Sequence, residues 1–164
     1  MNVRSMFPQE IDAAVSVWRE ANIDRGAPHG PERTARVRAK LSASDALPFV
    51  ALRPGVVGMA LAEPGRSEDG AGESDPSLLH ISMVFVHPTA QRTGVGLPLV
   101  LHVLEVARSM GCERVGVWTA RENTPARRLY ERAGMTLTGK TMPLQLGAAL
   151  HYECLLNDDE PARA

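Results

Sequence analysis

The middle of the chain reads Val86-His87-Pro88-Thr89-Ala90-Gln91-Arg92-Thr93-Gly94-Val95-Gly96. An apolar run with β-branched and aromatic members, 78–86, leads into this stretch, and Pro88 ends the run, so we expect a strand followed by a tight turn. An apolar stripe at helical spacing begins just after Gly96. The turn therefore leads directly into a helix of about 95–110, whose first backbone N–H groups have no partner within the helix.

This turn has the properties of an anion-binding site. Gly94 and Gly96 have no side chain to block a phosphate, and glycine tolerates unusual backbone dihedrals. Successive N–H groups and the helix dipole favour a di-anion, and Arg92 can add a charge-assisted hydrogen bond. The turn is not a nucleotide P-loop, because no Gly-Lys-Ser/Thr follows, and Leu99 stands where a dinucleotide fingerprint needs its third glycine. Many ligand-free turns also contain glycine, so both interpretations remain open on this stretch alone.

Outward from the turn, helices alternate with strands, and hairpins lie towards both ends. This order predicts a mixed sheet with helices on both faces and a right-handed crossover from 78–86 to 115–119. The other expected strands are 2–6, 49–52, 56–61, 136–142 and 150–156, and the other expected helices are 10–22, 32–41 and 124–133. The polar stretch 63–77 predicts a long surface loop, either a lid or disordered. We expect one domain, 1–157, with a flexible tail, 158–164.

Composition narrows the class of protein. The chain has 164 residues, 44% of them hydrophobic, and a formal net charge of -1, which fits one globular domain and argues against nucleic acid as a partner. No apolar run has the length of a membrane span, and the N-terminus lacks the apolar core of a signal peptide. Cys112 and Cys154 are far apart, which predicts reduced thiols and a cytoplasmic location. No His/Cys/Asp cluster has metal-ligand spacing, so no metal is expected.

The run Gln91-Arg92-x-Gly94-x-Gly96 resembles the acetyl-CoA signature of the GCN5-related N-acetyltransferase (GNAT) family. The similarity continues upstream in Val86-x-Pro88 and covers about 78–135. A second family motif follows downstream in Asn123, Ala126, Tyr130 and Gly134-Met135. The resemblance implies an α+β fold: a central mixed, mostly antiparallel sheet of about six or seven strands, flanked by about four helices.

The resemblance also implies an acetyl-CoA site. In the family, the end of the central strand presents main-chain groups to the pantetheine arm, the glycine turn holds the pyrophosphate, and a tyrosine lies near the sulfur. The implied cofactor contacts are Val84, Phe85, Val86, Gln91, Arg92, Thr93, Gly94, Val95, Gly96, Leu97 and Asn123. Tyr130 is the implied general acid, although a packed helix tyrosine would look the same. Asn123 is also placed to cap its helix.

The general base is not fixed by the sequence. An alkyl ammonium titrates near pH ~10, so an amine acceptor must lose a proton before it attacks. Glu63 follows a strand that should neighbour the central strand, and His80 lies on the central strand, on the same face as Ser82. Both are candidates, and a water chain could replace either. No nucleophile elbow is present, which favours direct attack over a covalent acyl-enzyme.

Three functions remain open. The first is acetylation of a small-molecule amine, and the second is acetylation of a protein or peptide at an α-amine or lysine. The third is a non-catalytic acyl-CoA sensor. The acceptor groove would be formed by the first two helices and the closing hairpin near 138–150, which carry no motif. A homodimer is possible, because such folds often pair through their last strands.

Overall fold

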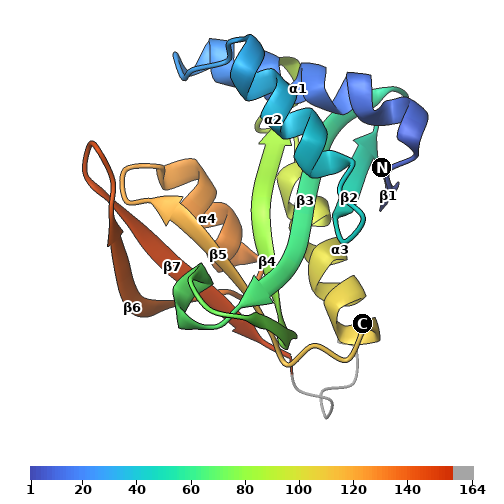
Figure 1. The fold of residues 1–164 in the computed structure, drawn as a ribbon. Coiled ribbons are helices and arrows are strands. Elements are labelled where there is room, and N and C mark those ends of the chain that lie inside the picture. The colour runs from blue at the N-terminus through green and yellow to red at the C-terminus, as the bar shows by residue number, and fades with distance from the viewer. Residues whose placement is uncertain (157–164) are drawn as a thin grey trace. The chain divides into compact units, whose positions relative to one another are not determined.

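The computed structural model describes residues 1–156, except the side chain of residue 69, so the predicted tail 158–164 lies outside the described residues. The elements are β1 (Asn2–Ser5), α1 (Ile11–Asp24), α2 (Pro31–Leu41), β2 (Leu47–Leu52), β3 (Val56–Arg66), β4 (Ser74–Val86), α3 (Gly96–Ser109), β5 (Arg114–Ala120), α4 (Thr124–Arg132), β6 (Thr136–Pro143) and β7 (Ala148–Leu155) (Figure 1). Within the described part, these strands form a seven-stranded sheet of order β1-β2-β3-β4-β5-β7-β6. The predicted α+β class is confirmed.

The sheet is mixed, as predicted. The pairs β1–β2, β2–β3, β5–β7 and β6–β7 are antiparallel, whereas β4 and β5 are parallel. Their register runs from Leu78 opposite Arg114 to Ile81 opposite Val117. Parallel neighbours need a crossover connection, and α3 supplies it. The sequence predicted this strand-helix-strand unit from the apolar run and the stripe that follows the glycine turn.

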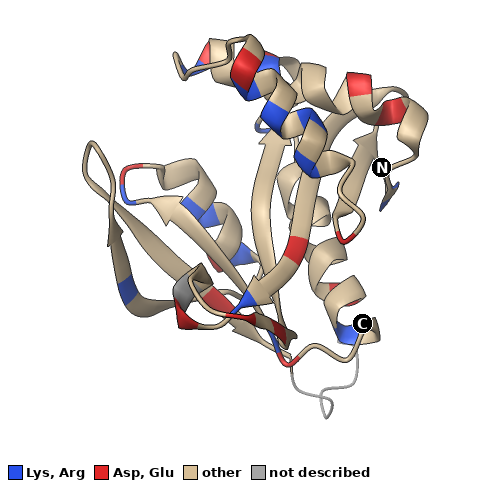
Figure 2. Cartoon of the chain, viewed as in Figure 1, with Lys and Arg blue, Asp and Glu red and all other residues tan. Residues whose placement is uncertain are grey.

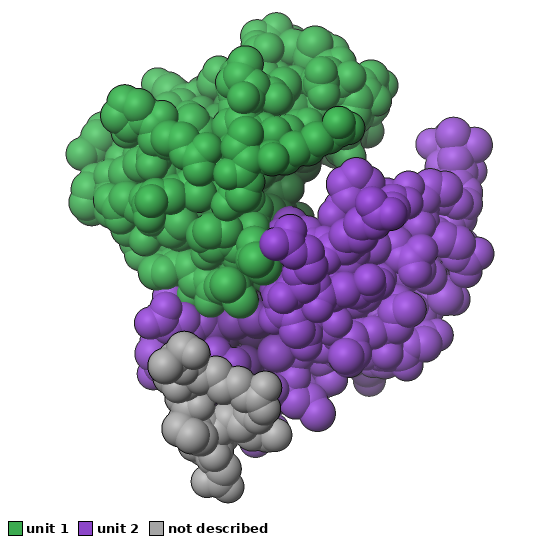
Figure 3. All heavy atoms as spheres, turned by 180° about the vertical axis from the view of Figure 1, so that it is seen from behind, with its two compact units in different colours: residues 1–63, 82–102 green, residues 64–81, 103–164 purple. Residues whose placement is uncertain are grey.

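The chain divides into two compact units (Figure 3). Unit 1 contains Met1–Glu63 and Ser82–His102, and unit 2 contains Pro64–Ile81 and Val103–Ala164. The glycine turn and the last part of β4 belong to unit 1. The helix α4 and the hairpin of β6 and β7 belong to unit 2. Each unit has buried residues of its own.

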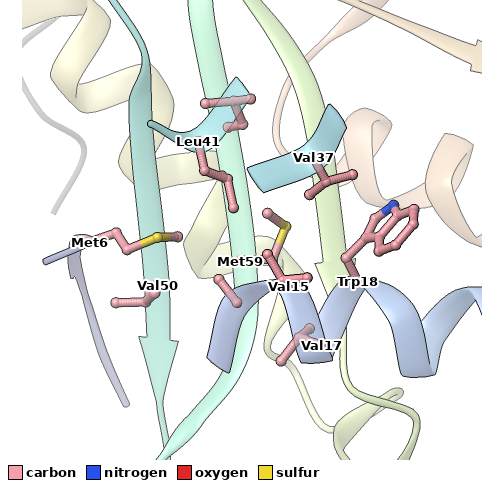
Figure 4. Close-up of a cluster of buried hydrophobic side chains, with 10 residues drawn as sticks. Met6, Val15, Val17, Trp18, Val37, Leu41, Val50 and Met59 are labelled. Carbon is pink, nitrogen blue, oxygen red and sulfur yellow. The ribbon is translucent and has the colours of Figure 1, made fainter. Parts of the chain in front are cut away.

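In unit 1, the helices α1 and α2 pack against the sheet. Their buried side chains recur at helical spacing, which gives each helix one apolar stripe. Trp18 from α1, Val37 and Leu41 from α2, and Met59 from β3 meet in one cluster (Figure 4). Phe85, near the end of β4, packs half-buried against the same cluster. Helix packing therefore extends to the strand segment that the sequence assigned to the cofactor.

In unit 2, the strand β7 supplies the most deeply buried large side chain. Tyr152 is completely buried, and Leu79, Val117 and Met135 are each at most 2% exposed. By contrast, every residue of β6 is exposed, because this strand forms the edge of the sheet. The core of unit 2 thus lies around β5 and β7.

The prediction of a long loop over 63–77 was wrong. β3 continues to Arg66 and β4 already begins at Ser74, so only residues 67–73 connect them. The connection is tightly bonded: Ser67 N donates to Glu73 O over 3.0 Å, and Arg66 Nε donates to Gly72 O over 2.8 Å. Polar composition misled the prediction, because strand residues beyond the edge of a core are also solvent-exposed and polar.

Candidate functional site

The turn between β4 and α3 is built from short local hydrogen bonds. His87 N donates to Val57 O over 2.8 Å, which ties the end of β4 to β3, and Ala90 N donates to His87 O over 2.8 Å. The last such bond runs from Gln91 N to Pro88 O over 3.4 Å. Within the described residues, no backbone N–H from 92 to 95 donates to a backbone carbonyl. These groups, followed by the first N–H groups of α3, are available to an anion.

The backbone of this turn is unusual at two positions. Arg92 has φ 62° and Gly94 has φ 81°, so both lie in the left-handed region. That region costs a non-glycine residue roughly 1–2 kcal/mol, and such strain tends to be retained at functional sites. Left-handed residues in a turn point successive N–H groups into one concavity. No atom lies within 4 Å of the place where a Cβ on Gly94 would stand, so the turn is open at this residue.

Three side chains hold the turn in this shape. Gln91 Nε2 donates to Val86 O over 3.2 Å, and Thr93 Oγ1 donates to Ala90 O over 2.6 Å. From the turn between β2 and β3, Arg53 reaches across and donates to Thr93 Oγ1 over 2.8 Å and to Thr93 O over 3.3 Å. Gln91 and Thr93, both predicted cofactor contacts, therefore use their side chains to shape the turn. Among the described residues, the Gln91 side chain keeps its Oε1 and one N–H free for a ligand, whereas the Thr93 hydroxyl is used within the turn.

The start of α3 rests directly on β3. A Cβ built on Gly58 would lie 2.8 Å from Val95 Cγ1 and 3.0 Å from Leu99 Cδ1, distances that real Cβ atoms do not tolerate without a shift. Val95 is 2% exposed, so its side chain belongs to the packing, and only its main chain can face a ligand. Gly58 thus allows the helix to approach the sheet closely.

The predicted pantetheine segment, Val84 to Val86, is half-buried throughout. The Val86 carbonyl already accepts the hydrogen bond from Gln91. The Arg25 guanidinium carbon lies 5.5 Å from the centre of the Phe85 ring. Main-chain groups here therefore lie beside an arginine that the sequence did not single out.

In unit 2, Asn123 caps α4. Its side-chain oxygen accepts a hydrogen bond from Ala126 N over 3.3 Å. This is the capping role that the sequence left open beside a cofactor role. Since that oxygen is already used, any cofactor contact by Asn123 falls to its amide nitrogen or its main chain.

Tyr130, on α4, has a buried ring and a hydroxyl without a protein partner. The residue is 6% exposed, and its hydroxyl makes no hydrogen bond to any described residue. Because no buried side-chain nitrogen or oxygen of the described residues lacks a partner, the Tyr130 hydroxyl must reach the surface. Burial raises the pKa of Tyr130 to about 12, so the hydroxyl keeps its proton at neutral pH and can donate a hydrogen bond.

The second tyrosine of the chain, Tyr152, has a hydroxyl with protein partners. Tyr152 donates to Glu131 Oε1 over 2.8 Å and accepts from Arg127 Nε over 3.0 Å. Its ring lies 6.0 Å from that of Tyr130, at an angle of 46°. The Tyr152 hydroxyl is therefore held by hydrogen bonds within the protein, whereas the Tyr130 hydroxyl has no partner among the described residues.

The two candidate bases belong to different units. Glu63, at the unit 1 end of β3, forms an ion pair with Lys40 Nζ over 3.2 Å, and its side chain is 32% exposed. His80 is half-buried on the unit 2 part of β4. Ser82, expected on the face of His80, donates to Leu61 O over 3.4 Å. Within each unit, the geometry is compatible with Glu63 and with His80 as the general base.

Sequence reasoning missed a pair of polar residues at the end of α1. Asn22 is only 2% exposed, and it lies one turn after the buried Trp18, on the apolar stripe of the helix. Arg25 Nε and Nη2 both donate to Asn22 Oδ1, over 3.0 and 2.7 Å. The one signal in the sequence was a polar residue on an otherwise apolar stripe.

Between α1 and α2 lies a hollow of about 820 Å³. It is lined by Arg19 from α1 and by residues of α2 and the preceding loop, including His29, Thr34 and Arg38. Basic residues follow one another along α2 (Figure 2). Arg38 is paired with Asp12 of α1, so part of this charge is already neutralised.

The described residues contain neither a metal-binding cluster nor a membrane-spanning helix. No three His, Cys, Asp or Glu side chains in residues 1–156 lie close enough together to hold a metal ion. Over the same residues, no helix has the length and apolar character needed to cross a bilayer.

The sequence matches the acetyltransferase (GNAT) family over residues 14–135. This range contains the glycine turn, Asn123 and Tyr130. The chain therefore belongs to the acetyltransferase (GNAT) family, and the predicted resemblance is confirmed.

Individual relatives refine this picture. The mycothiol acetyltransferase of Cellulomonas flavigena is 32% identical over 146 residues, which is 83% of this chain but 40% of that relative. The chain thus spans less than half the length of the curated relatives it matches.

Solved structures share the fold at low identity. An aminoglycoside 6'-N-acetyltransferase complexed with coenzyme A has a TM-score of 0.72 and 14% identity, covering 94% of this chain and 97% of that one. The ribosomal-protein-S18-alanine N-acetyltransferase of Escherichia coli has a TM-score of 0.71 and 16% identity, covering 98% of both chains. Proteins named for a small-molecule acceptor and for a protein acceptor therefore share this fold.

Proposed function

We propose that this protein is a cytoplasmic enzyme that transfers the acetyl group of acetyl-CoA to a primary amine of a small molecule. The observation that carries the proposal is the open turn before α3, where backbone N–H groups beyond Gln91 lack backbone acceptors and Arg92 and Gly94 are left-handed. A turn of this kind suits two linked phosphates. Membership of the GNAT family supports acetyl-CoA as the ligand that carries them.

Acetyl-CoA would lie along unit 1. The pyrophosphate would accept hydrogen bonds from main-chain N–H groups of residues 92–97, with the exposed Arg92 side chain adding charge. The amides of the pantetheine arm would pair with Val84 to Val86 in the manner of an added strand. A main-chain N–H of that segment would face the thioester oxygen and stabilise it as negative charge develops.

The chemistry is a direct transfer within a ternary complex. The ammonium of the acceptor gives its proton to a base, and the free amine attacks the thioester carbonyl. A C–N bond forms, the attacking nitrogen loses its second proton to solvent, the C–S bond breaks, and the electron pair leaves on the CoA sulfur. Tyr130, whose hydroxyl is accessible and protonated, then gives its proton to that thiolate and regains one from solvent. A thiolate of ordinary pKa, about 8.5, needs only modest help to leave.

Glu63 and His80 remain alternative bases. Removing the true base should lower kcat/KM about a hundredfold at neutral pH, with recovery at high pH, where the amine is already free. Glu63→Gln and His80→Gln, assayed across pH, separate the two. The variant of the residue that is not the base should keep the wild-type profile, and two wild-type profiles would indicate a water chain.

Acetylation of a protein or peptide is the second candidate, since the E. coli relative in fold carries that name. The third is a non-catalytic acyl-CoA sensor. The accessible Tyr130 hydroxyl favours catalysis over sensing, because a sensor has no thiolate to protonate.

One assay tests the three functions together. Thiol release from acetyl-CoA is measured with small amines, aminoglycosides and peptides that have free α-amines or lysines. Release with small amines is expected. Release with peptides alone would favour the second candidate, and tight acetyl-CoA binding without release would favour the sensor. Absence of acetyl-CoA binding would overturn all three.

A further inference from the structure

The end of α1 holds an arginine in a fixed orientation, which we call the Asn22–Arg25 corner. Two nitrogens of one guanidinium edge, Nε and Nη2, donate to the same oxygen, Asn22 Oδ1. The other end of the Asn22 carboxamide is also fixed, and this keeps the oxygen turned towards Arg25. Asn22 Nδ2 donates to Trp18 O over 2.8 Å in the buried last turns of the helix. The guanidinium plane is therefore set by the fold.

The corner leaves part of the guanidinium unused. Nη1 makes no hydrogen bond to a described residue, and Nη2 gives only one of its two hydrogens to Asn22. Together, Nη1 and Nη2 form the end-on fork of the guanidinium, which presents two parallel N–H donors. This fork matches the spacing of two carboxylate oxygens.

The charge at this corner has no counter-ion in the described chain. The ion pairs of residues 1–156 involve Arg4, Arg38, Lys40 and Arg114 but not Arg25. Burial lowers the pKa of Arg25, so the surroundings disfavour the charge. A neutral hydrogen bond to Asn22 does not offset that cost in the way a carboxylate would. An anion from outside would complete the corner.

The position of the corner indicates which molecule brings the anion. The Arg25 guanidinium lies over the Phe85 ring at 5.5 Å, and Phe85 is the middle residue of the Val84–Val86 segment. The inference rests on the proposed function, in which this segment carries the thioester. The phosphates of CoA would be bound at the glycine turn, so the molecule that meets Arg25 beside the thioester is the acceptor.

We propose that Arg25 binds a carboxylate on the acceptor, so that the substrates are small amines that also carry a carboxylate, such as α-amino acids. Arg25 is then a specificity-determining residue, Asn22 orients it, and Phe85 supports the face of its guanidinium. A polycationic acceptor would be disfavoured by the same charge.

The test compares α-amino acids with their carboxamides as acceptors, with acetyl-CoA held constant. A charge-assisted, bidentate contact predicts that the wild-type enzyme prefers the carboxylate by on the order of tenfold or more in kcat/KM. Arg25→Gln should lower kcat/KM for the amino acids far more than for the carboxamides, which brings the ratio of the two close to one. Arg25→Lys should keep part of the preference. Comparing variants with the wild type removes the effect of the different amine pKa values of the two acceptors.

Arg36→Gln is the matched control, because Arg36 is an exposed arginine of α2 outside every ion pair of the described residues. It should leave the ratio as in the wild type. Equal loss on both acceptors in Arg25→Gln, or a wild-type preference for carboxamides or an aminoglycoside, would overturn the inference. If carboxamides are acetylated with no carboxylate preference, the proposed function survives and only this inference fails. If no amine is acetylated, both fail.

Discussion

The glycine turn and the helix α4 carry out their proposed roles by different means. In the turn, the main chain does the binding: Gln91 and Thr93 direct their side chains into the turn, and the N–H groups face outward. On α4, a single side-chain oxygen, that of Tyr130, is the active part. A site made of main chain should therefore tolerate many side chains but no change of backbone shape. A site made of one atom should tolerate repacking but not the loss of that atom.

The largest effect is expected at Gly94, because a binding site made of main chain depends on the backbone shape of this residue. A valine there must adopt φ 81° or change the backbone of the turn, so the Kd for acetyl-CoA should rise roughly a hundredfold or more. Isothermal titration calorimetry measures it. Gly139→Val is the control, because Gly139 also has a positive φ, 85°, with no atom within 4 Å of its Cβ position. Equal losses in both variants would mean that the turn does not bind the cofactor.

The protonation of Tyr130 should affect stability at alkaline pH. The folded protein holds the Tyr130 proton to about pH 12, whereas an ordinary tyrosine loses it at 10.0. Between those values the unfolded chain binds fewer protons than the folded one, so the free energy of unfolding falls as pH rises. The fall should approach about 3 kcal/mol in the wild type relative to Tyr130→Phe. Urea titrations at pH 9 to 12 measure this, and parallel curves for the two proteins would contradict it.

Changing each tyrosine to phenylalanine separates the proposed catalytic hydroxyl of Tyr130 from the structural hydroxyl of Tyr152. Tyr130→Phe removes a hydroxyl without a protein partner, so stability at neutral pH should be unchanged while kcat falls roughly tenfold to a hundredfold. Tyr152→Phe leaves Arg127 and Glu131 without their shared partner, and should cost about 1–2 kcal/mol of stability. The kcat of folded Tyr152→Phe should stay close to that of the wild type. Thiol-release kinetics and thermal unfolding together measure both outcomes, and full kcat in Tyr130→Phe would remove its role as acid.

The smallest effect is expected at Arg53, which acts on the turn from outside. Arg53→Ala removes two exposed hydrogen bonds to Thr93, so the turn should become less ordered and the Kd for acetyl-CoA should rise about threefold to tenfold. Arg66→Ala, which removes a comparable bond to Gly72, should leave the Kd unchanged. If Arg53→Ala binds as well as the wild type, the local hydrogen bonds of Gln91 and Thr93 suffice to shape the turn.

Features with local causes were predictable from the sequence. Pro88 ends a strand and Gly111 ends a helix through constraints that act within a few residues, and both elements end where expected. The family motif also placed Tyr130 and Asn123 on or next to one helix. The cap by Asn123 was predicted because a cap needs only its own helix.

Features that depend on distant partners were not predictable. Arg66 and Ser67 look like loop residues until their hydrogen bonds to Gly72 and Glu73 are seen. Gln91 matches the cofactor motif, yet its side chain bonds to Val86. Arg25 has no motif at all, because its orientation comes from Asn22 and its place beside Phe85 comes from the packing of α1 on β4. Chemistry carried by a long-range side-chain contact leaves little trace in one sequence.

The close approach at Gly58 has a consequence for natural variation in this chain. Gly58 contacts no proposed substrate, but a methyl group there would collide with Val95 and Leu99 and push the first turn of α3 outward. A lineage that acquired alanine at position 58 would need a smaller residue at 95 or 99 to restore the spacing. We therefore expect these three positions to change together among orthologues, with the total side-chain volume held nearly constant.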